Sequence, residues 1–175
     1  MDHLILRSRR GLRVGSTFEG RPAISAATQT DGTLITPYGG KIVDLVVTPE
    51  RAAEMKSAAG NLASLTLDER GVCDLELLSV GGFSPLQGFM GKADYERVVA
   101  EQRLADGTLW PLPVVLPVTP GTGIAEGETL ALRDVYGNLL AFLHIEEIYR
   151  PDKQAEAQHV HGTLDRMHPA VAYLD

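Results

Sequence analysis

Three histidines near the end of the 175-residue sequence have a spacing that could hold a metal ion. His159 and His161 are two residues apart, so both side chains would share one face of a strand, and His168 follows seven residues later. A glycine and a proline interrupt the same stretch, which favours a loop, and no second cluster offers further ligands. We therefore expect no metal site, and no cofactor.

The other reactive side chains do not form a catalytic set. Glu146 and Glu147 are neighbours on an expected strand and would point to opposite faces, so they cannot act as one acid/base pair. Asp68 and Glu69 fall in the first turn of an expected helix, where the helix dipole explains the negative charge. Cys73, the single cysteine, falls within the same helix, where we expect a buried or half-buried thiol. We expect no catalytic and no substrate-binding residue on this chain.

A glycine-rich stretch, "LLSVGGFSPLQGFMG" over residues 77–91, could either cradle a phosphate or pack two pieces of backbone closely together. Gly81-Gly82 would end the preceding helix. The apolar residues between the glycines are anchors that a bare phosphate loop does not need, and no Lys-Ser/Thr pair follows. We interpret this stretch as a packing corner.

The composition is that of an ordinary globular protein, with 44% hydrophobic and 22% charged residues and a net charge of −7. Residues 1–30 hold five arginines and lack a clean period, which predicts a flexible lead-in before one domain at residues 31–175. The acidic body makes nucleic-acid binding unlikely, because phosphate contacts need clustered Lys and Arg. A single cysteine, no secretory signal and no apolar run of about 20 residues favour a cytoplasmic protein without a membrane segment.

Helix signals dominate the first part of the expected domain. Short strands are expected at residues 33–47, and a helix is expected to open at Thr48-Pro49 and to stop at Gly60-Asn61. A longer amphipathic helix is expected to begin at a capping box made by Thr66 and Glu69. A further helix is expected over residues 93–101, with Tyr95, Val98 and Val99 facing inward.

Strand signals dominate the sequence after Trp110. Pro113, Pro117 and Pro120 confine their strand to an edge or a corner, and Gly137-Asn138 predicts a hairpin turn between two apolar runs. Helices followed by antiparallel strands indicate an α+β fold, most simply a partly open β-barrel with flanking helices.

Four stretches together resemble a known family: "LITPYGGKIVDLVV", "SLTLDERGVCDLELLSVGGFSPLQGFMGKADYERVV", "RLADGTLWPLPVVLPV" and "GNLLAFLHIEEIYRPDKQAEAQHVHGTLDRMHPAVAYL". Their order and spacing are similar to the N-terminal, PUA-like domain of ATP sulfurylase (sulfate adenylyltransferase) over residues 34–174. The family-motif residues that we single out are Gly81, Gly82, Phe83, Ser84, Pro85, Leu86, Gly88, Phe89, Met90, Trp110 and Tyr149.

The resemblance implies a role in sulfate assimilation without chemistry of its own. The family's enzyme joins ATP and sulfate into adenosine 5′-phosphosulfate and pyrophosphate, using a Q-x-R-N-P element and an H-x-x-H pair in a following nucleotidyltransferase domain. Neither element occurs in this sequence, so we expect the chain alone to be inactive and its partner to be a catalytic domain, in cis as in the family or in trans. A homo-oligomer stays open. The alternatives are a free PUA-like RNA-binding module and a stand-alone regulatory or interaction protein.

Overall fold

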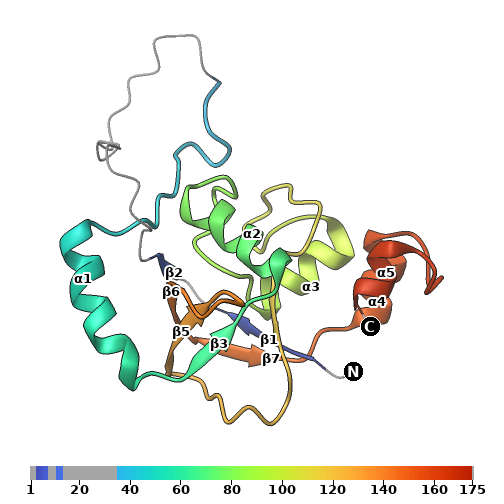
Figure 1. Ribbon diagram of the computed structural model, residues 1–175. Coiled ribbons are helices and arrows are strands. Elements are labelled where there is room, and N and C mark those ends of the chain that lie inside the picture. The colour runs from blue at the N-terminus through green and yellow to red at the C-terminus, as the bar shows by residue number, and fades with distance from the viewer. Residues whose placement is uncertain (1–2, 8–10, 14–34, 175) are drawn as a thin grey trace. The chain divides into compact units, whose positions relative to one another are not determined.

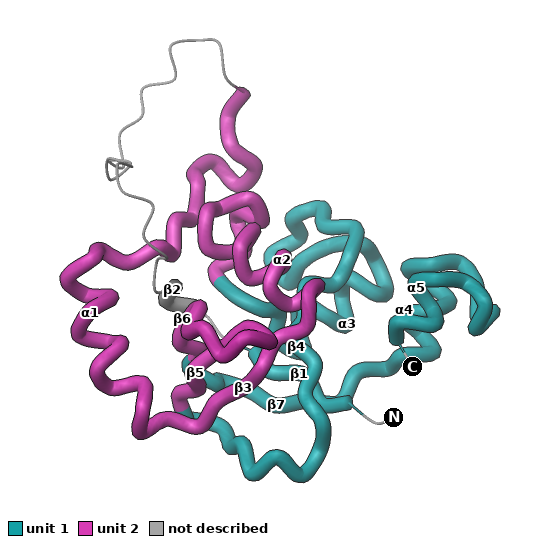
Figure 2. Tube along the Cα trace, viewed as in Figure 1, with its two compact units in different colours: residues 1–9, 88–128, 144–175 teal, residues 10–87, 129–143 magenta. Residues whose placement is uncertain are grey.

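The computed structural model describes residues 3–7, 11–13 and 35–174, and it divides into two compact units (Figure 1). Unit 1 comprises residues 1–9, 88–128 and 144–175, and unit 2 comprises residues 10–87 and 129–143 (Figure 2). Each unit holds one small sheet together with its own helices. The α+β prediction is therefore confirmed, whereas the partly open barrel stays a prediction.

The sheet of unit 1 has three strands in the order β4-β1-β7, namely β4 (Leu116–Val118), β1 (Leu4–Arg7) and β7 (Glu147–Tyr149). The middle strand pairs antiparallel with both neighbours. Pro117 lies on the outer strand β4, in agreement with the expectation that its missing N–H restricts it to an edge.

Strand β1 differs from the expected flexible lead-in. Its sequence Leu-Ile-Leu-Arg supplies an apolar run, and Ile5 and Leu6 are 2% and 0% exposed. Burying both apolar side chains offsets the conformational entropy that is lost when so short a segment becomes ordered. Most of residues 1–30 lies outside the described residues.

Three helices belong to unit 1: α3 (Lys92–Glu101), α4 (Lys153–Val160) and α5 (Pro169–Leu174). The expected inward face of α3 is confirmed, because Tyr95, Val98 and Val99 are all buried. Helix α4 contacts both α3 and α5, and Figure 1 shows α4 and α5 side by side.

The sheet of unit 2 has four strands in the order β2-β6-β5-β3, namely β2 (Gly11–Arg13), β6 (Leu139–His144), β5 (Thr129–Arg133) and β3 (Ser64–Thr66). The expected turn between β5 and β6 is present, with Gly137 at φ +85°. Asp134 holds this turn, because its carboxylate accepts from the amides of Tyr136 and Asn138. An all-antiparallel arrangement is wrong, since β3 runs parallel to β5.

Helix α1 (Pro49–Ala58) begins and ends close to the expected positions in unit 2. Its N-cap is Thr48, whose hydroxyl accepts from the Arg51 amide at 3.4 Å, and Pro49 occupies the first turn. A short 3₁₀ turn, η1 (Ala59–Asn61), follows at the expected Gly60-Asn61 stop.

Helix α2 (Glu69–Ser79) begins later than the capping box predicts. Thr66 lies on strand β3, and the amide of Leu67 donates to the Arg133 carbonyl, so the sheet holds the backbone extended up to this point. The N-cap is instead Asp68, whose Oδ1 accepts from the Gly71 amide at 2.7 Å. Tertiary strand pairing has overridden a local capping signal.

The two candidate caps of α2 can be separated by mutation. We expect Asp68→Ala to lower the free energy of unfolding by about 1 kcal/mol, because an orphan amide of the first turn loses its acceptor. Thr66→Ala, on the exposed strand position, should change it by less than about 0.5 kcal/mol. Urea unfolding followed by circular dichroism measures both, and a larger loss for Thr66→Ala than for Asp68→Ala would contradict the capping by Asp68.

Residues 35–48 form no strand, so the short strands expected there are wrong. Gly39 and Gly40 both have positive φ and follow Pro37 in a tight turn, which prevents an extended run. The segment is instead attached to the end of α2, where the Leu45 amide donates to the Ser79 carbonyl at 2.9 Å.

Candidate functional site

Residues 81–87 of the glycine-rich stretch form a tight corner in unit 2, directly after α2. Gly81 has φ +80°, and a Cβ at this position would lie 2.8 Å from the carbonyl oxygen of Val43 and collide with the Ile42 side chain. The hydroxyl of Ser84 accepts from the Val43 amide at 2.9 Å and donates to the Gly81 carbonyl at 2.7 Å. The missing side chain of Gly81 thus admits the backbone of a segment some 40 residues earlier in sequence.

Other members of the corner serve the same packing. Ser84 and Leu86 are each 8% exposed, Phe83 and Pro85 are half-buried, and Gly82 is exposed. The Leu86 amide donates to the Phe83 carbonyl at 2.8 Å, which closes the turn. The Ser84 hydroxyl and the Phe83 carbonyl of this corner are thus hydrogen-bonded to groups of the same chain.

Residues 88–91 belong to unit 1 and lead into α3. Gly88 is buried, and Phe89 and Met90 are 3% and 1% exposed. The Met90 amide donates to the Val114 carbonyl at 2.9 Å, and the Tyr149 hydroxyl donates to the Met90 carbonyl at 3.1 Å. The structure therefore brings two of the selected motif residues, Met90 and Tyr149, into direct contact.

A buried polar cluster lies next to this contact in unit 1. The Tyr95 hydroxyl donates to Glu156 Oε2 at 2.9 Å, and Glu156 is only 6% exposed. The rings of Tyr95 and Tyr149 lie 5.6 Å apart between centroids. Burial, reinforced by the Glu156 carboxylate, raises the pKa of Tyr95 far above its usual range. Burial likewise raises the pKa of Tyr149, with Glu147 as the next cause.

These two phenols predict a loss of stability at alkaline pH. Each phenol keeps its proton to a higher pH in the folded than in the unfolded chain. Its contribution to the free energy of unfolding is therefore complete below about pH 10 and declines as the pH rises further. Above pH 10 the free energy of unfolding should fall by up to about 1.4 kcal/mol per pH unit for each tyrosine.

Urea unfolding at several pH values between 9 and about 11.5 measures this slope. Tyr95→Phe and Tyr149→Phe should each reduce it, whereas Tyr136→Phe is the matched control, because Tyr136 is 86% exposed. An equal slope in all three variants and the parent would show that other groups cause the alkaline loss.

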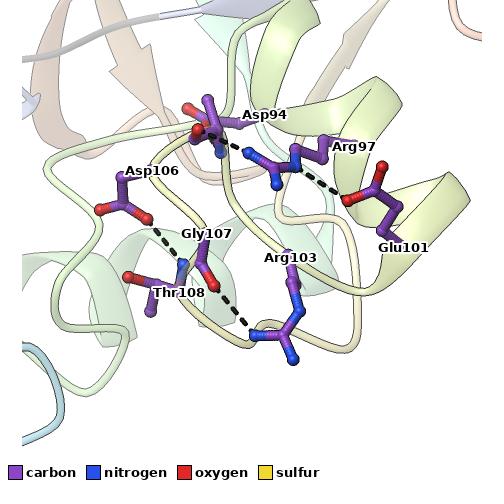
Figure 3. Close-up of polar contacts among 8 residues, drawn as sticks. Asp94, Arg97, Glu101, Arg103, Asp106, Gly107 and Thr108 are labelled. Carbon is purple, nitrogen blue, oxygen red and sulfur yellow. Dashed lines mark hydrogen bonds and ion pairs between the residues drawn. The ribbon is translucent and has the colours of Figure 1, made fainter.

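A polar network fastens the loop "RLADGTLWP" onto α3 (Figure 3). The Asp94 carboxylate accepts from the Ala105 amide, and Arg97 donates to the Ala105 carbonyl, both at 2.8 Å. Arg97 also contacts Glu101 at 3.0 Å, and Arg103 donates to the Gly107 carbonyl at 3.0 Å. Both arginines are thus used to hold main-chain carbonyl groups.

Two further features shape this loop. Hydrogen bonds from Thr108 lower the pKa of the Asp106 carboxyl below its usual range. Trp110 is half-buried, and its amide donates to the Gln102 carbonyl at 2.8 Å. Trp110 therefore closes the loop against the end of α3.

The other candidate residues lie as follows. His159 is on α4, His161 is its C-cap, and the rings of His161 and His168 lie 6.1 Å apart. Over residues 3–7, 11–13 and 35–174, no group of three or more His, Cys, Asp or Glu side chains could hold a metal ion. Cys73 is exposed, so its expected burial is wrong: it falls on the solvent side of α2, whereas Leu75 and Leu78 are buried.

Sequence reasoning missed the role of Glu146 and Glu147. The two were expected on one strand, pointing to opposite faces, but β7 begins only at Glu147 and both carboxylates contact Arg7, at 3.5 and 3.7 Å. It also missed Glu156, because its partner Tyr95 is 61 residues away. The apolar run before Arg7 was a signal that this segment forms a strand, and hence that Arg7 could lie near Glu146 and Glu147. No local sequence pattern indicated the hydrogen bond between Tyr95 and Glu156.

Comparison with known proteins matches the same part of the chain as the resemblance at residues 34–174. The family model of the PUA-like domain matches residues 35–175. Sulfate adenylyltransferase from Synechococcus sp. (strain JA-3-3Ab) is 45% identical over 145 residues, which cover 82% of this chain and 37% of the relative. Sulfate adenylyltransferase from Phaeosphaeria nodorum is 45% identical over 144 residues, covering 79% of this chain and 25% of the relative. The chain thus spans between a quarter and just over a third of these relatives.

A solved structure shows the same fold in part. A hexameric APS kinase from Thiobacillus denitrificans matches with a TM-score of 0.56 and 37% identity, over 67% of this chain and 27% of that chain. Among the helices of the described residues, none is long and apolar enough to cross a membrane.

Proposed function

Because the chain belongs to the PUA-like domain family, we propose that it acts as the N-terminal, non-catalytic domain of a sulfate adenylyltransferase. The observation that carries this proposal is the sequence identity of about 45% to sulfate adenylyltransferases. The match covers some 80% of this chain but only 25–37% of the length of those enzymes. Its role is to pack on and support a catalytic domain that makes adenosine 5′-phosphosulfate from ATP and sulfate. A cytoplasmic location and a homo-oligomer remain predictions.

The contacts of the motif residues support a packing role. Gly81 leaves room for the segment at Val43, and the Ser84 hydroxyl accepts a hydrogen bond from the Val43 amide. The Tyr149 hydroxyl donates a hydrogen bond to the Met90 carbonyl. Transfer of an adenylyl group to sulfate needs positive charge around the phosphates. Arg97 on α3 and Arg103 in the loop after it instead donate hydrogen bonds to main-chain carbonyl groups.

The charge pattern also disfavours the alternative of an RNA-binding module. Several arginines are paired with carboxylates or carbonyl groups of the same chain, as in Arg51 with Glu54, Arg70 with Asp74 and Arg133 with the Gly137 carbonyl. Recognition of RNA requires a basic surface with aromatic platforms. The proposed supporting domain is therefore preferred.

A domain replacement in the Synechococcus relative tests the proposal. Its matched segment of 145 residues is replaced by the corresponding residues of this chain, and pyrophosphate release is measured with ATP and sulfate. We expect the chimera to be active and the isolated chain to release no pyrophosphate above background. A relative from which the segment is deleted is the control, and it should lose activity or fail to fold.

Two results would contradict the proposal. One is turnover by the isolated chain, which would place chemistry on these residues. The other is a folded chimera that is as inactive as the deletion control, which would mean that this chain cannot support the catalytic part.

A further inference from the structure

The middle strand of the unit 1 sheet comes from outside the residues that match the PUA-like family. Strand β1 spans residues 4–7, whereas the match begins at residue 35. Both of its neighbours, β4 and β7, lie within the matched region. Without β1 these two strands would face each other across a gap one strand wide, which we name the β4–β7 slot.

The main chain and the two central side chains of β1 fill this slot. Ile5 is opposite Pro117 on one side and Tyr149 on the other, in antiparallel register. Leu6 follows it, and consecutive residues of a strand point to opposite faces. Since both are almost fully buried, both faces of the slot are apolar. Ile5 packs in a cluster that also contains Tyr95, Val99 and Tyr149.

The far end of the slot is shaped for a cation. Arg7 lies within 3.5 Å of Glu146 and 3.7 Å of Glu147, and its carbonyl accepts from the Glu146 amide at 3.0 Å. Gly91 leaves room for the arginine, because a Cβ there would lie 2.7 Å from Arg7 Nε and closer still to its Cδ. The slot therefore accepts a strand that has two adjacent apolar residues followed by a positively charged residue.

We propose that the β4–β7 slot is a binding site for an extended peptide with this pattern, and that the chain fills it with its own residues 3–7. Binding is by strand addition, in which main-chain hydrogen bonds provide affinity and the side-chain sites provide specificity. The site works in trans, so a separate copy of the segment can take the place of the covalently attached one. This inference does not depend on the proposed enzyme family.

A cleavable form of the full chain tests the proposal. A recognition sequence for a site-specific protease is inserted between residues 24 and 25, and the purified chain is cut. Residues 1–24 are expected to stay bound through size-exclusion chromatography. A dye-labelled peptide of residues 1–10, which lacks β2 and its pairing with β6, should in excess compete for the slot, bind with one copy per chain, and leave the uncut chain unlabelled.

Peptide variants test the specificity. Replacing Ile5 and Leu6 together by aspartate should weaken binding by at least about 100-fold, because both charges would have to be buried. Arg7→Ala should weaken it by up to about fivefold, as expected for a partly exposed ion pair. In a chain that carries Glu146→Gln the effect of Arg7→Ala should be smaller, since the two residues act on one contact.

Several outcomes would overturn the proposal. A cut chain that releases residues 1–24, keeps its melting temperature and takes up no peptide would show that the slot does not bind a strand. A cut chain that unfolds and is not restored by excess peptide would show the same. Equal binding of the peptide to cut and uncut chains would place it elsewhere, and exchange of β1 between two uncut copies, seen as a dimer, would assign the slot to a second copy instead.

Discussion

Gly81→Ala is expected to lower the free energy of unfolding by about 2–5 kcal/mol. Two effects add at this position. The left-handed backbone at φ +80° costs an L-residue about 1–2 kcal/mol. The new methyl group would also press on the Ile42 side chain and the Val43 carbonyl, and crowding of this kind costs about 1–3 kcal/mol. Urea unfolding followed by circular dichroism measures the sum.

Gly121→Ala is the matched control for this prediction. Gly121 has a similar φ of +85°, but a Cβ there meets no atom within 4 Å. It should therefore show the backbone cost alone, about 1–2 kcal/mol. Equal losses at the two positions would mean that the close approach of residues 42–43 to the corner does not contribute.

Met90→Ala is expected to lower the free energy of unfolding by about 2–5 kcal/mol, because truncation leaves a cavity in a buried region. Met90 is 1% exposed, and the hydrogen bonds of its backbone to Val114 and Tyr149 are unaffected by the change. The loss therefore reports the side chain, whose packing disappears together with the hydrogen bond that its Sδ accepts from the Val114 amide at 3.5 Å. Thermal unfolding by calorimetry gives an independent measure of it.

Met167→Ala provides the matched control for Met90. The same atoms are removed from a side chain that is 87% exposed, so the free energy of unfolding should change by less than about 0.5 kcal/mol. A small loss at Met90, close to that at Met167, would show that the neighbouring side chains collapse into the space without cost.

Sequence reasoning succeeded where a few neighbouring residues decide the structure. Thr48 and Pro49 start α1 because a hydroxyl acceptor and a preset φ act within one turn. Gly137 permits the turn between β5 and β6 for the same local reason. The inward face of α3 followed from the three- and four-residue spacing of its apolar positions.

Prediction failed where distant segments compete with local signals. Thr66 has the spacing of a capping box, but pairing of β3 with β5 retains it in a strand. The partners of the glycine corner, Ile42 and Val43, lie about 40 residues before it, and the bond between Tyr95 and Glu156 joins two helices 61 residues apart. No periodicity within one segment specifies such contacts.

The placement of β1 has a consequence for the order in which the protein can fold during its synthesis. Ile5 emerges from the ribosome about 140 residues before Tyr149, its partner in β7. At a translation rate of about 5–20 residues per second, the nascent Ile5-Leu6 pair waits roughly 7–30 s for that strand. The unit 1 sheet therefore closes late, and the apolar side chains of Ile5 and Leu6 stay exposed on the nascent chain until β7 has been made.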